Sequence, residues 1–292
     1  MTDHGSAADR PGASDFGGGT KYDLDLGAAE KATGSWSTIV ANRTGGQGKT
    51  VVTQLLYEGL RQAGVPVKLA SVDSDAGSAQ RSKLGGLYPE TKDLPISAKL
   101  SDVADEDPSA SLRHWDAVGA LLRERNTVID LGANVVGSLL NWAQMSLEAS
   151  AMRGKPLNFL VVVTAQEKSA ADAIAVLKDI EETREAIEIG KIGVVFNEGL
   201  GKFERSGAQM SALRALIAEK GYASIEIGRG MIKAVDAGVS IGRLGTMTSA
   251  EYQSVMELEY DTTAIRELRL AQAWIKKSIE AVAAAGFAPT AA

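Results

Sequence analysis

Residues 42–50 of the chain read NRTGGQGKT, with three glycines just ahead of a lysine and a threonine. A glycine-rich turn has no Cβ atoms in its way, so its backbone N–H groups can converge on the phosphates of a nucleotide. The helix N-terminus that follows such a turn adds further donors. Lys49 is then placed to reach the β- and γ-phosphates, and the Thr50 hydroxyl to bind Mg²⁺. We call this stretch the phosphate loop, and we predict the following nucleotide-binding residues in it: Thr44, Gly45, Gly46, Gln47, Gly48, Lys49 and Thr50.

The sequence on both sides of the phosphate loop has the pattern of a strand, a loop and a helix. An apolar run at 36–42 leads into it, and apolar residues recur at helical spacing from 49 to about 63. The general eight-residue motif begins with a glycine, and this chain has Arg43 at that position. A chance match to the remaining pattern in a chain of this length has odds of about one in a thousand.

Four further apolar runs have the length and composition of buried strands. They lie at 67–72, 127–130, 159–163 and 192–196, are rich in Val and Ile, and are separated by helical patterns. This alternation predicts an α/β fold with a mainly parallel sheet flanked by helices. Together with the phosphate loop, it indicates the three-layer α/β/α architecture of P-loop NTPases.

The chain is expected to contain one domain. Residues 1–35 are rich in Gly, Ala, Ser and Asp and are predicted to be a disordered tail. Residues 36–285 form the predicted P-loop nucleotide-binding domain, and residues 286–292 a frayed C-terminus. Within the domain, 81–111 is expected to form surface loops or a short helical excursion, and 252–285 a long helical segment.

The composition excludes several classes of function. A formal charge of −6 argues against a protein that coats nucleic acid with its whole surface, so any DNA contact must be local. The chain has no cysteine, which excludes disulfides and thiol chemistry. Its two histidines, His4 and His114, are too few for a zinc site. With no signal-peptide pattern and no apolar run of about 18 residues, we expect a cytoplasmic protein that does not span a membrane.

The phosphate loop resembles the deviant Walker A loop of the ParA/MinD ATPases, written x-x-Lys-Gly-Gly-x-Gly-Lys-Thr, a family that also lacks the first glycine. The resemblance extends from about residue 38 to residue 244 and is carried by short motifs. It implies that the chain binds ATP and Mg²⁺, forms an ATP-dependent homodimer and acts on a protein partner.

Two aspartates match further motifs of that family. The run VDSD at 72–75 is similar to its switch I signature, which implies that Asp75 lies near Mg²⁺ and the attacking water. Asp130 ends an apolar strand and is similar to the Walker B aspartate, with Gly132 able to offer an N–H to the γ-phosphate. We therefore assign catalysis to Lys49, Asp75 and Asp130, and Mg²⁺ to Thr50, Asp75 and Asp130. Turn capping and ordinary strand ends remain alternative explanations of these aspartates.

Two later positions match the parts of the family that contact the nucleotide base. Asn197 ends the strand at 192–196, and a side-chain amide can pair with adenine as donor and acceptor together. Gly228 lies in a late loop, at a position where the family typically has proline. The order and spacing of these two residues support the resemblance more than either residue does alone.

The chain departs from the family at the signature lysine, which reaches the nucleotide of the partner subunit and would fall at Thr44. Unless Arg43 or a partner protein substitutes, the charge that neutralises the transition state between subunits is missing. The departure predicts nucleotide binding with slow hydrolysis.

Several biological roles remain open. The first is a plasmid or chromosome partition ATPase, or an accessory ATPase of conjugative plasmids, with DNA contacts from a local basic patch at Arg266, Arg269, Lys276 and Lys277. The second is a positioning ATPase for division or secretion machinery, although the Ala-rich C-terminus disfavours a membrane anchor. A nucleotide-bound, non-hydrolysing adaptor and a metabolic phosphotransferase are the other two alternatives.

Overall fold

The computed structural model describes residues 37–73, 81–95, 108–124, 126–146, 155–203, 207–230 and 233–287. The tail predicted at 1–35 lies outside the described residues. The described strands are β1 (Ser37–Ala41), β2 (Lys68–Asp73), β3 (Lys92–Pro95), β4 (Thr127–Leu131), β5 (Leu157–Val163), β6 (Ile189–Asn197) and β7 (Ala223–Ile227). The described helices are α1 (Lys49–Gln62), α2 (Lys83–Leu87), α4 (Pro108–Leu122), α5 (Val136–Ser146), α7 (Glu167–Thr183), α8 (Ala208–Lys220), α9 (Lys233–Asp236), α10 (Ile241–Thr246), α11 (Ser249–Val255) and α12 (Asp261–Ala284), with a 3-10 turn η1 at Glu198–Leu200.

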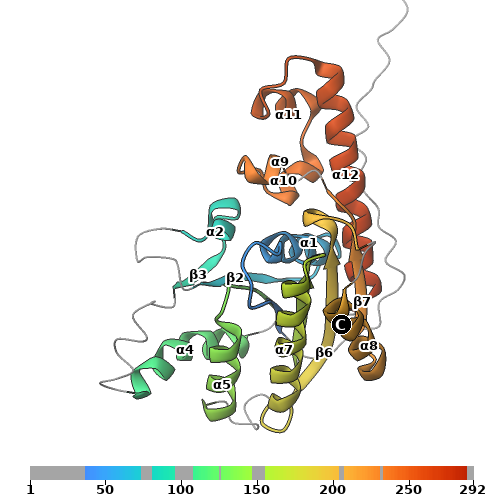
Figure 1. Ribbon diagram of the computed structural model, residues 1–292. Coiled ribbons are helices and arrows are strands. Elements are labelled where there is room, and N and C mark those ends of the chain that lie inside the picture. The colour runs from blue at the N-terminus through green and yellow to red at the C-terminus, as the bar shows by residue number, and fades with distance from the viewer. Residues whose placement is uncertain are drawn as a thin grey trace, which may run out of the picture.

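The strands form one seven-stranded sheet in the order β3-β2-β4-β1-β5-β6-β7, and every pairing in it is parallel. Helices α4, α5, α7 and α8 cover one face, whereas α1 and α12 cover the other (Figure 1). The predicted three-layer α/β/α fold is confirmed. In the view of Figure 1, α10 and α11 stand above the sheet.

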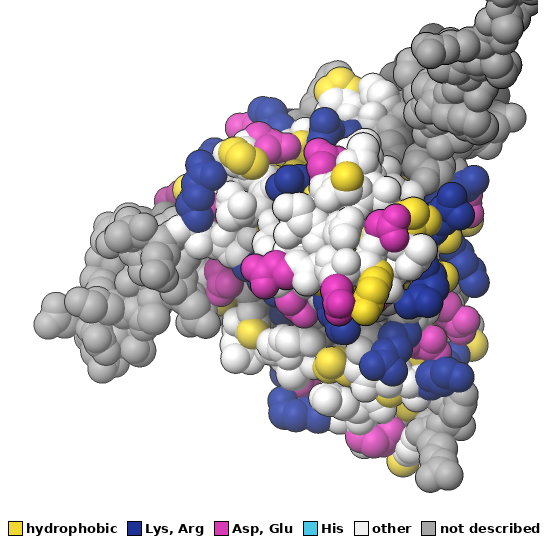
Figure 2. All heavy atoms as spheres, turned by 90° about the horizontal axis from the view of Figure 1, so that it is seen from above, with side chains coloured by type: hydrophobic (Ala, Val, Ile, Leu, Met, Phe, Trp, Pro, Cys, Tyr) yellow, Lys and Arg dark blue, Asp and Glu magenta, His cyan; other side chains and the backbone are white. Residues whose placement is uncertain are grey.

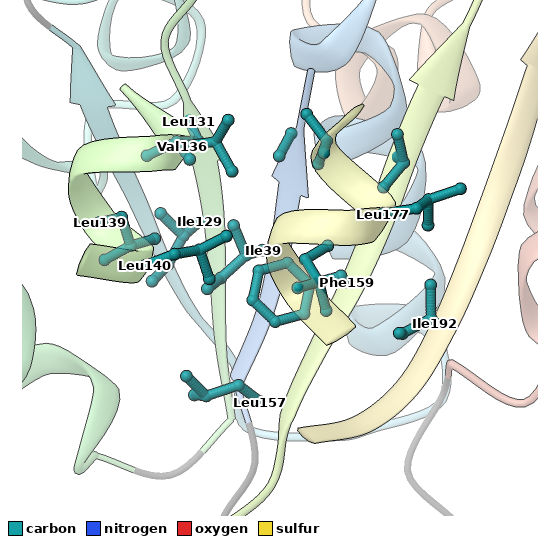
Figure 3. Packing of buried hydrophobic residues seen from close by; sticks show 14 of the residues in the cluster. Ile39, Ile129, Leu131, Val136, Leu139, Leu140, Leu157, Phe159, Leu177 and Ile192 are labelled. Atoms are coloured by element: carbon teal, nitrogen blue, oxygen red, sulfur yellow. The ribbon is translucent and has the colours of Figure 1, made fainter. Parts of the chain in front are cut away.

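The central strands are buried on both faces, which explains their continuous apolar runs. In β5, Phe159, Val161 and Val163 point to one side of the sheet, and Leu160 and Val162 to the other. Figure 3 shows the cluster on the first of these sides, in which Phe159 lies next to α7 and Leu139 and Leu140 come from α5. Burying a Phe or Leu side chain contributes about 1.5–3 kcal/mol, so the two cores on either side of the sheet account for much of the fold's stability.

Two strands were not predicted, and both lie at the edges of the sheet. Strand β3 occurs within 81–111, where surface loops or a helical excursion were expected, and β7 has the sequence ASIEI. In β7 only Ile225 and Ile227 are buried, because an edge strand is covered less completely than a central one. Such strands lack the continuous apolar run that identifies the central strands.

The C-terminal region differs from the prediction in two ways. The helical pattern expected at 252–285 is broken between α11 and α12, where Glu257 adopts a positive φ of 50°. Phe287, expected in the frayed end, is 1% exposed and packs against Gly193 of β6, where a Cβ would lie 2.7 Å from its ring. Residues 288–292 lie outside the described part of the chain. None of the described helices combines the length and apolar composition needed to cross a bilayer.

We expect Phe287→Ala to lower the free energy of unfolding by about 3 kcal/mol, because it empties a packed site between α12 and β6. Urea denaturation measures the change. The control is Leu270→Ala on α12, whose side chain is 56% exposed and whose truncation should change the free energy of unfolding by less than about 0.5 kcal/mol. Equal effects of the two substitutions would mean that Phe287 is not part of the core.

Candidate phosphate-binding site

The phosphate loop connects the carboxyl end of β1 to the first turn of α1. Gly46 and Gly48 have φ values of 73° and 85°, in the left-handed region that favours glycine. At Gly48 a Cβ would also collide with the Asn197 side chain. The Gly48 carbonyl accepts hydrogen bonds from Val51 and Val52 at 3.0 Å and so begins the helix. The loop therefore has the geometry that the glycine pattern predicts.

The Lys49 side chain is buried inside the loop rather than extended into solvent. Its Nζ donates to the Thr44 carbonyl at 3.1 Å. Burial lowers the pKa of Lys49, while the negative charges of Asp130 and Asp73 act in the opposite direction. The ammonium group thus lies among loop carbonyls and carboxylates, at the place where a bound phosphate would gain most from a cation.

Asp130 lies at the end of β4, within hydrogen-bond distance of α1. Thr50 Oγ1 donates to one carboxylate oxygen at 2.7 Å, and Thr53 Oγ1 to the other at 3.4 Å. Burial raises the pKa of Asp130 to about 6, although the Thr50 hydrogen bond and the Lys49 charge favour ionisation. The predicted pair of Thr50 and Asp130 is thereby brought together as one oxygen-donor set.

These donors fit Mg²⁺, which prefers oxygen ligands and is usually held by one or two carboxylates together with substrate phosphates. The hydroxyl of Thr50 and the carboxylate of Asp130 would supply the protein's share. In the described part of the chain, no group of three or more His, Asp or Glu side chains is arranged to hold a metal ion by itself.

Asp73 joins the site, although the sequence analysis assigned the switch I role to Asp75. Asp75 lies outside the described residues. The Asp73 carboxylate lies against Gly132, where a Cβ would collide with it, and its charge acts on both Lys49 and Asp130. The sequence shows only that Asp73 directly follows the apolar run at 67–72, whereas the pairing of β2 with β4, which brings it near Asp130, is decided by the fold.

The loop after β4 is attached to two neighbouring segments. The Gly132 N–H, which was expected to face a γ-phosphate, donates to the Val72 carbonyl at 2.8 Å. Asn134, with a positive φ of 63°, donates its N–H to the Arg43 carbonyl at 3.1 Å. The contact of Gly132 with phosphate remains a prediction, and Asn134 is a link to the phosphate loop that the sequence did not indicate.

The two predicted base-contacting residues form hydrogen bonds with other parts of the protein. Asn197 Nδ2 donates to the Gln47 carbonyl at 2.9 Å, and its Oδ1 accepts from the Gly199 N–H at 3.0 Å. The Gly228 carbonyl accepts from Trp274 Nε1 at 2.7 Å. Asn197 therefore supports the phosphate loop, and the contacts of Asn197 and Gly228 with a base remain predictions.

Helix α7 holds the side chains at the start of the phosphate loop. Thr44 Oγ1 is bonded to the Asp172 carboxylate and accepts from Lys168 Nζ at 3.2 Å. Arg43 forms an ion pair with Asp179 on the same helix. An ammonium group thus lies beside Thr44, but it comes from α7 and is itself paired with Asp172 at 3.1 Å.

No protein-family model matches the chain, and no curated protein sequence matches it either. Among solved structures, the fold is similar to that of a McdA variant from Cyanothece in complex with ATP, with 14% identity, a TM-score of 0.43, and coverage of 82% of this chain and 97% of that one. It is also similar to a nucleotide-binding protein from Archaeoglobus fulgidus in complex with ADP, with 18% identity, a TM-score of 0.42, and coverage of 69% and 86%. Similarities this distant do not assign the chain to a family.

We expect Asp130→Asn to become more stabilising as the pH rises. Because the folded-state pKa of Asp130 is raised to about 6, its contribution to stability is fully present below its unfolded-state pKa and is lost as the pH rises through about 6. The asparagine does not titrate. The difference in unfolding free energy between variant and wild type should therefore shift in favour of the variant by about 2 kcal/mol from pH 4 to pH 7. Urea denaturation of both proteins across this range measures it, and a constant difference would contradict the raised pKa.

Proposed function

We propose that the chain is an ATP-binding switch protein of ParA/MinD type that requires Mg²⁺ and hydrolyses ATP slowly. The observation that carries the proposal is the arrangement of the phosphate loop: Lys49 is buried within it, and Thr50 is hydrogen-bonded to Asp130 at 2.7 Å. A phosphate-binding turn, a buried cation and a Mg²⁺ donor pair lie at one edge of a parallel sheet, where such folds bind ligands.

Each residue has a role that its position supports. The loop glycines and the N-terminus of α1 would donate N–H groups to phosphate, and Lys49 would neutralise its charge. Thr50 and Asp130 would hold Mg²⁺, which when bound neutralises charge on the phosphates. Asp73 adds a second carboxylate next to Lys49. We keep Asp75 as the residue that orients the attacking water, a role that follows from the family resemblance alone.

Slow turnover is supported by the surroundings of Thr44. Two cations near Thr44 are paired with carboxylates of α7: Arg43 with Asp179, and Lys168 with Asp172. Either cation must break an ion pair before it can reach a transferred phosphate, in its own subunit or in a second copy. Nucleotide binding without rapid hydrolysis suits a protein that changes its association state with ATP, and the same observation favours a non-hydrolysing adaptor as the second candidate.

Our first hypothesis for the biological role is plasmid or chromosome partition or conjugative plasmid maintenance. The alternative is a positioning ATPase. The first hypothesis is supported by the outer face of α12, where Arg266, Arg269, Lys276 and Lys277 are all exposed. On the face seen from above in Figure 2, basic and acidic side chains are interspersed. A DNA contact would therefore be local to α12, as expected for a chain of net negative charge. We further propose a cytoplasmic location and an ATP-dependent homodimer with a protein partner.

We expect the wild-type protein to bind ATP with Mg²⁺ and Lys49→Ala to bind it at least tenfold more weakly, because the substitution removes the cation within the phosphate loop. Isothermal titration calorimetry measures affinity, phosphate release measures turnover and light scattering measures association state. EDTA should weaken ATP binding in the wild type. The control is Lys178→Ala, an exposed lysine of α7 for which no change is expected.

The outcomes separate the candidates. Binding with slow turnover and ATP-dependent dimerisation supports the switch protein, whereas binding without turnover supports the adaptor. If wild type and Lys49→Ala both fail to bind nucleotide, the assignment as an ATPase is wrong.

We expect the quadruple variant Arg266→Ala, Arg269→Ala, Lys276→Ala and Lys277→Ala to bind duplex DNA more weakly than the wild type in the presence of ATP. If all four cations contact phosphates, the slope of log K against log salt should fall by about 3.6. Fluorescence anisotropy over a salt series measures it, with Lys178→Ala combined with Lys220→Ala as a control that removes two cations from other helices. Equal DNA binding by wild type and quadruple variant would exclude this face of α12 and weaken the partition reading.

A further inference from the structure

The side chain of Gln47 is buried, although the residue lies between two glycines in a loop at the surface of the sheet edge. Only 2% of it is exposed, whereas Gly45 and Gly46 are open to solvent. Burying an amide costs free energy unless its polar atoms are bonded. The Gln47 amide meets this requirement, since Oε1 accepts from the hydroxyls of both Thr164 and Ser169, and Nε2 donates to the Gly45 carbonyl at 3.2 Å.

The two hydroxyls are themselves fixed to the scaffold. Thr164 follows β5 and donates its hydroxyl to Gln47 at 2.7 Å, and Ser169 lies in the first turn of α7. Ser169 Oγ accepts from the Thr164 N–H at 3.0 Å, so its proton is available to Gln47. Both residues are fully buried. Gln47 is thereby attached to the sheet and to α7 at once.

The backbone of Gln47 is held as well. Its carbonyl accepts from Asn197 Nδ2, and Asn197 fills the space that a Cβ at Gly48 would need. Gln47 is the one residue with a side chain between Gly45 and Gly48, so a side-chain anchor for this turn has to come from it. Glycines in the left-handed region have no side chain to restrict them, and ordering them costs more entropy than ordering other residues.

We infer that Gln47 is a positioning residue: through Thr164 and Ser169, its side chain holds the phosphate loop in the conformation that binds nucleotide. The inference rests on the proposed nucleotide binding and adds to it, because the Gln47 amide would contact the loop rather than the phosphates. A loop that is already ordered before the ligand arrives binds more tightly, since less entropy is lost on binding.

The first test is Gln47→Leu, which keeps a side chain of similar size but leaves the Thr164 and Ser169 hydroxyls without their acceptor. We expect ATP affinity to fall at least tenfold. In the protein without nucleotide, hydrogen exchange of the backbone amides at 43–48 should accelerate. The control is Gln144→Leu, which removes a Gln–Thr hydrogen bond of 3.1 Å to Thr183 at the opposite end of α7 and should change neither quantity.

A second variant separates positioning from simple packing. Combining Gln47→Leu with Thr164→Val removes one of the two hydroxyls left without an acceptor, and keeping Ser169 preserves the acceptor of the Thr164 N–H, so thermal stability should recover in part. If the hydrogen bonds position the loop, ATP affinity and exchange protection at 43–48 stay low in this more stable protein. Recovery of affinity together with stability would show that Gln47 only fills space, and would overturn the inference.

The exchange measurement keeps the two proposals distinct, because it does not depend on nucleotide. Unchanged exchange at 43–48 in Gln47→Leu would overturn the positioning role even if the wild type binds ATP. If the wild type fails to bind ATP but exchange still accelerates in Gln47→Leu, Gln47 orders the loop and the proposed function is refuted.

Discussion

Parallel pairing of β1 with both β4 and β5 is the constraint on which the rest of the structure depends. Parallel strands all end at the same edge of a sheet, so whatever follows them is brought together there. The phosphate loop after β1 consequently meets Asp130 at the end of β4 and Thr164 after β5. The neighbouring strands add Asp73 and Asn197 at the same edge. One pattern of strand pairing thus assembles the whole candidate site.

The candidate site contains two buried charged side chains, Lys49 and Asp130, which do not contribute to the stability of the fold by burial alone. Burial opposes the ionised forms of both Lys49 and Asp130, and each is partly compensated by the charge of the other. Buried charges of this kind cost free energy unless they are paired and hydrogen-bonded. The apolar clusters on both faces of the sheet can offset that cost.

Helix α7 joins the phosphate loop to one of these clusters. A helix turns every 3.6 residues, so a single helix can present one polar and one apolar stripe. The polar stripe of α7 carries Ser169, Asp172 and Asp179, which bond the side chains of Gln47, Thr44 and Arg43. Its apolar stripe packs into the cluster shown in Figure 3. A change in the conformation of the loop would therefore alter its hydrogen bonds and its ion pair with α7.

The sequence by itself determined the glycine turn, the alternation of central strands with helices, and the pairing of Thr50 with a strand-end aspartate, because each follows from short-range pattern and from the general geometry of parallel sheets. Tertiary structure decided the rest. The edge strands β3 and β7 carry little apolar signal, since they are less completely buried, and the buried position of Phe287 depends on a contact with β6. Asn197 reaches the phosphate loop across 150 residues, and Gln47 reaches Ser169 across 122. Such contacts depend on strand order and helix placement, which no local pattern of residues encodes.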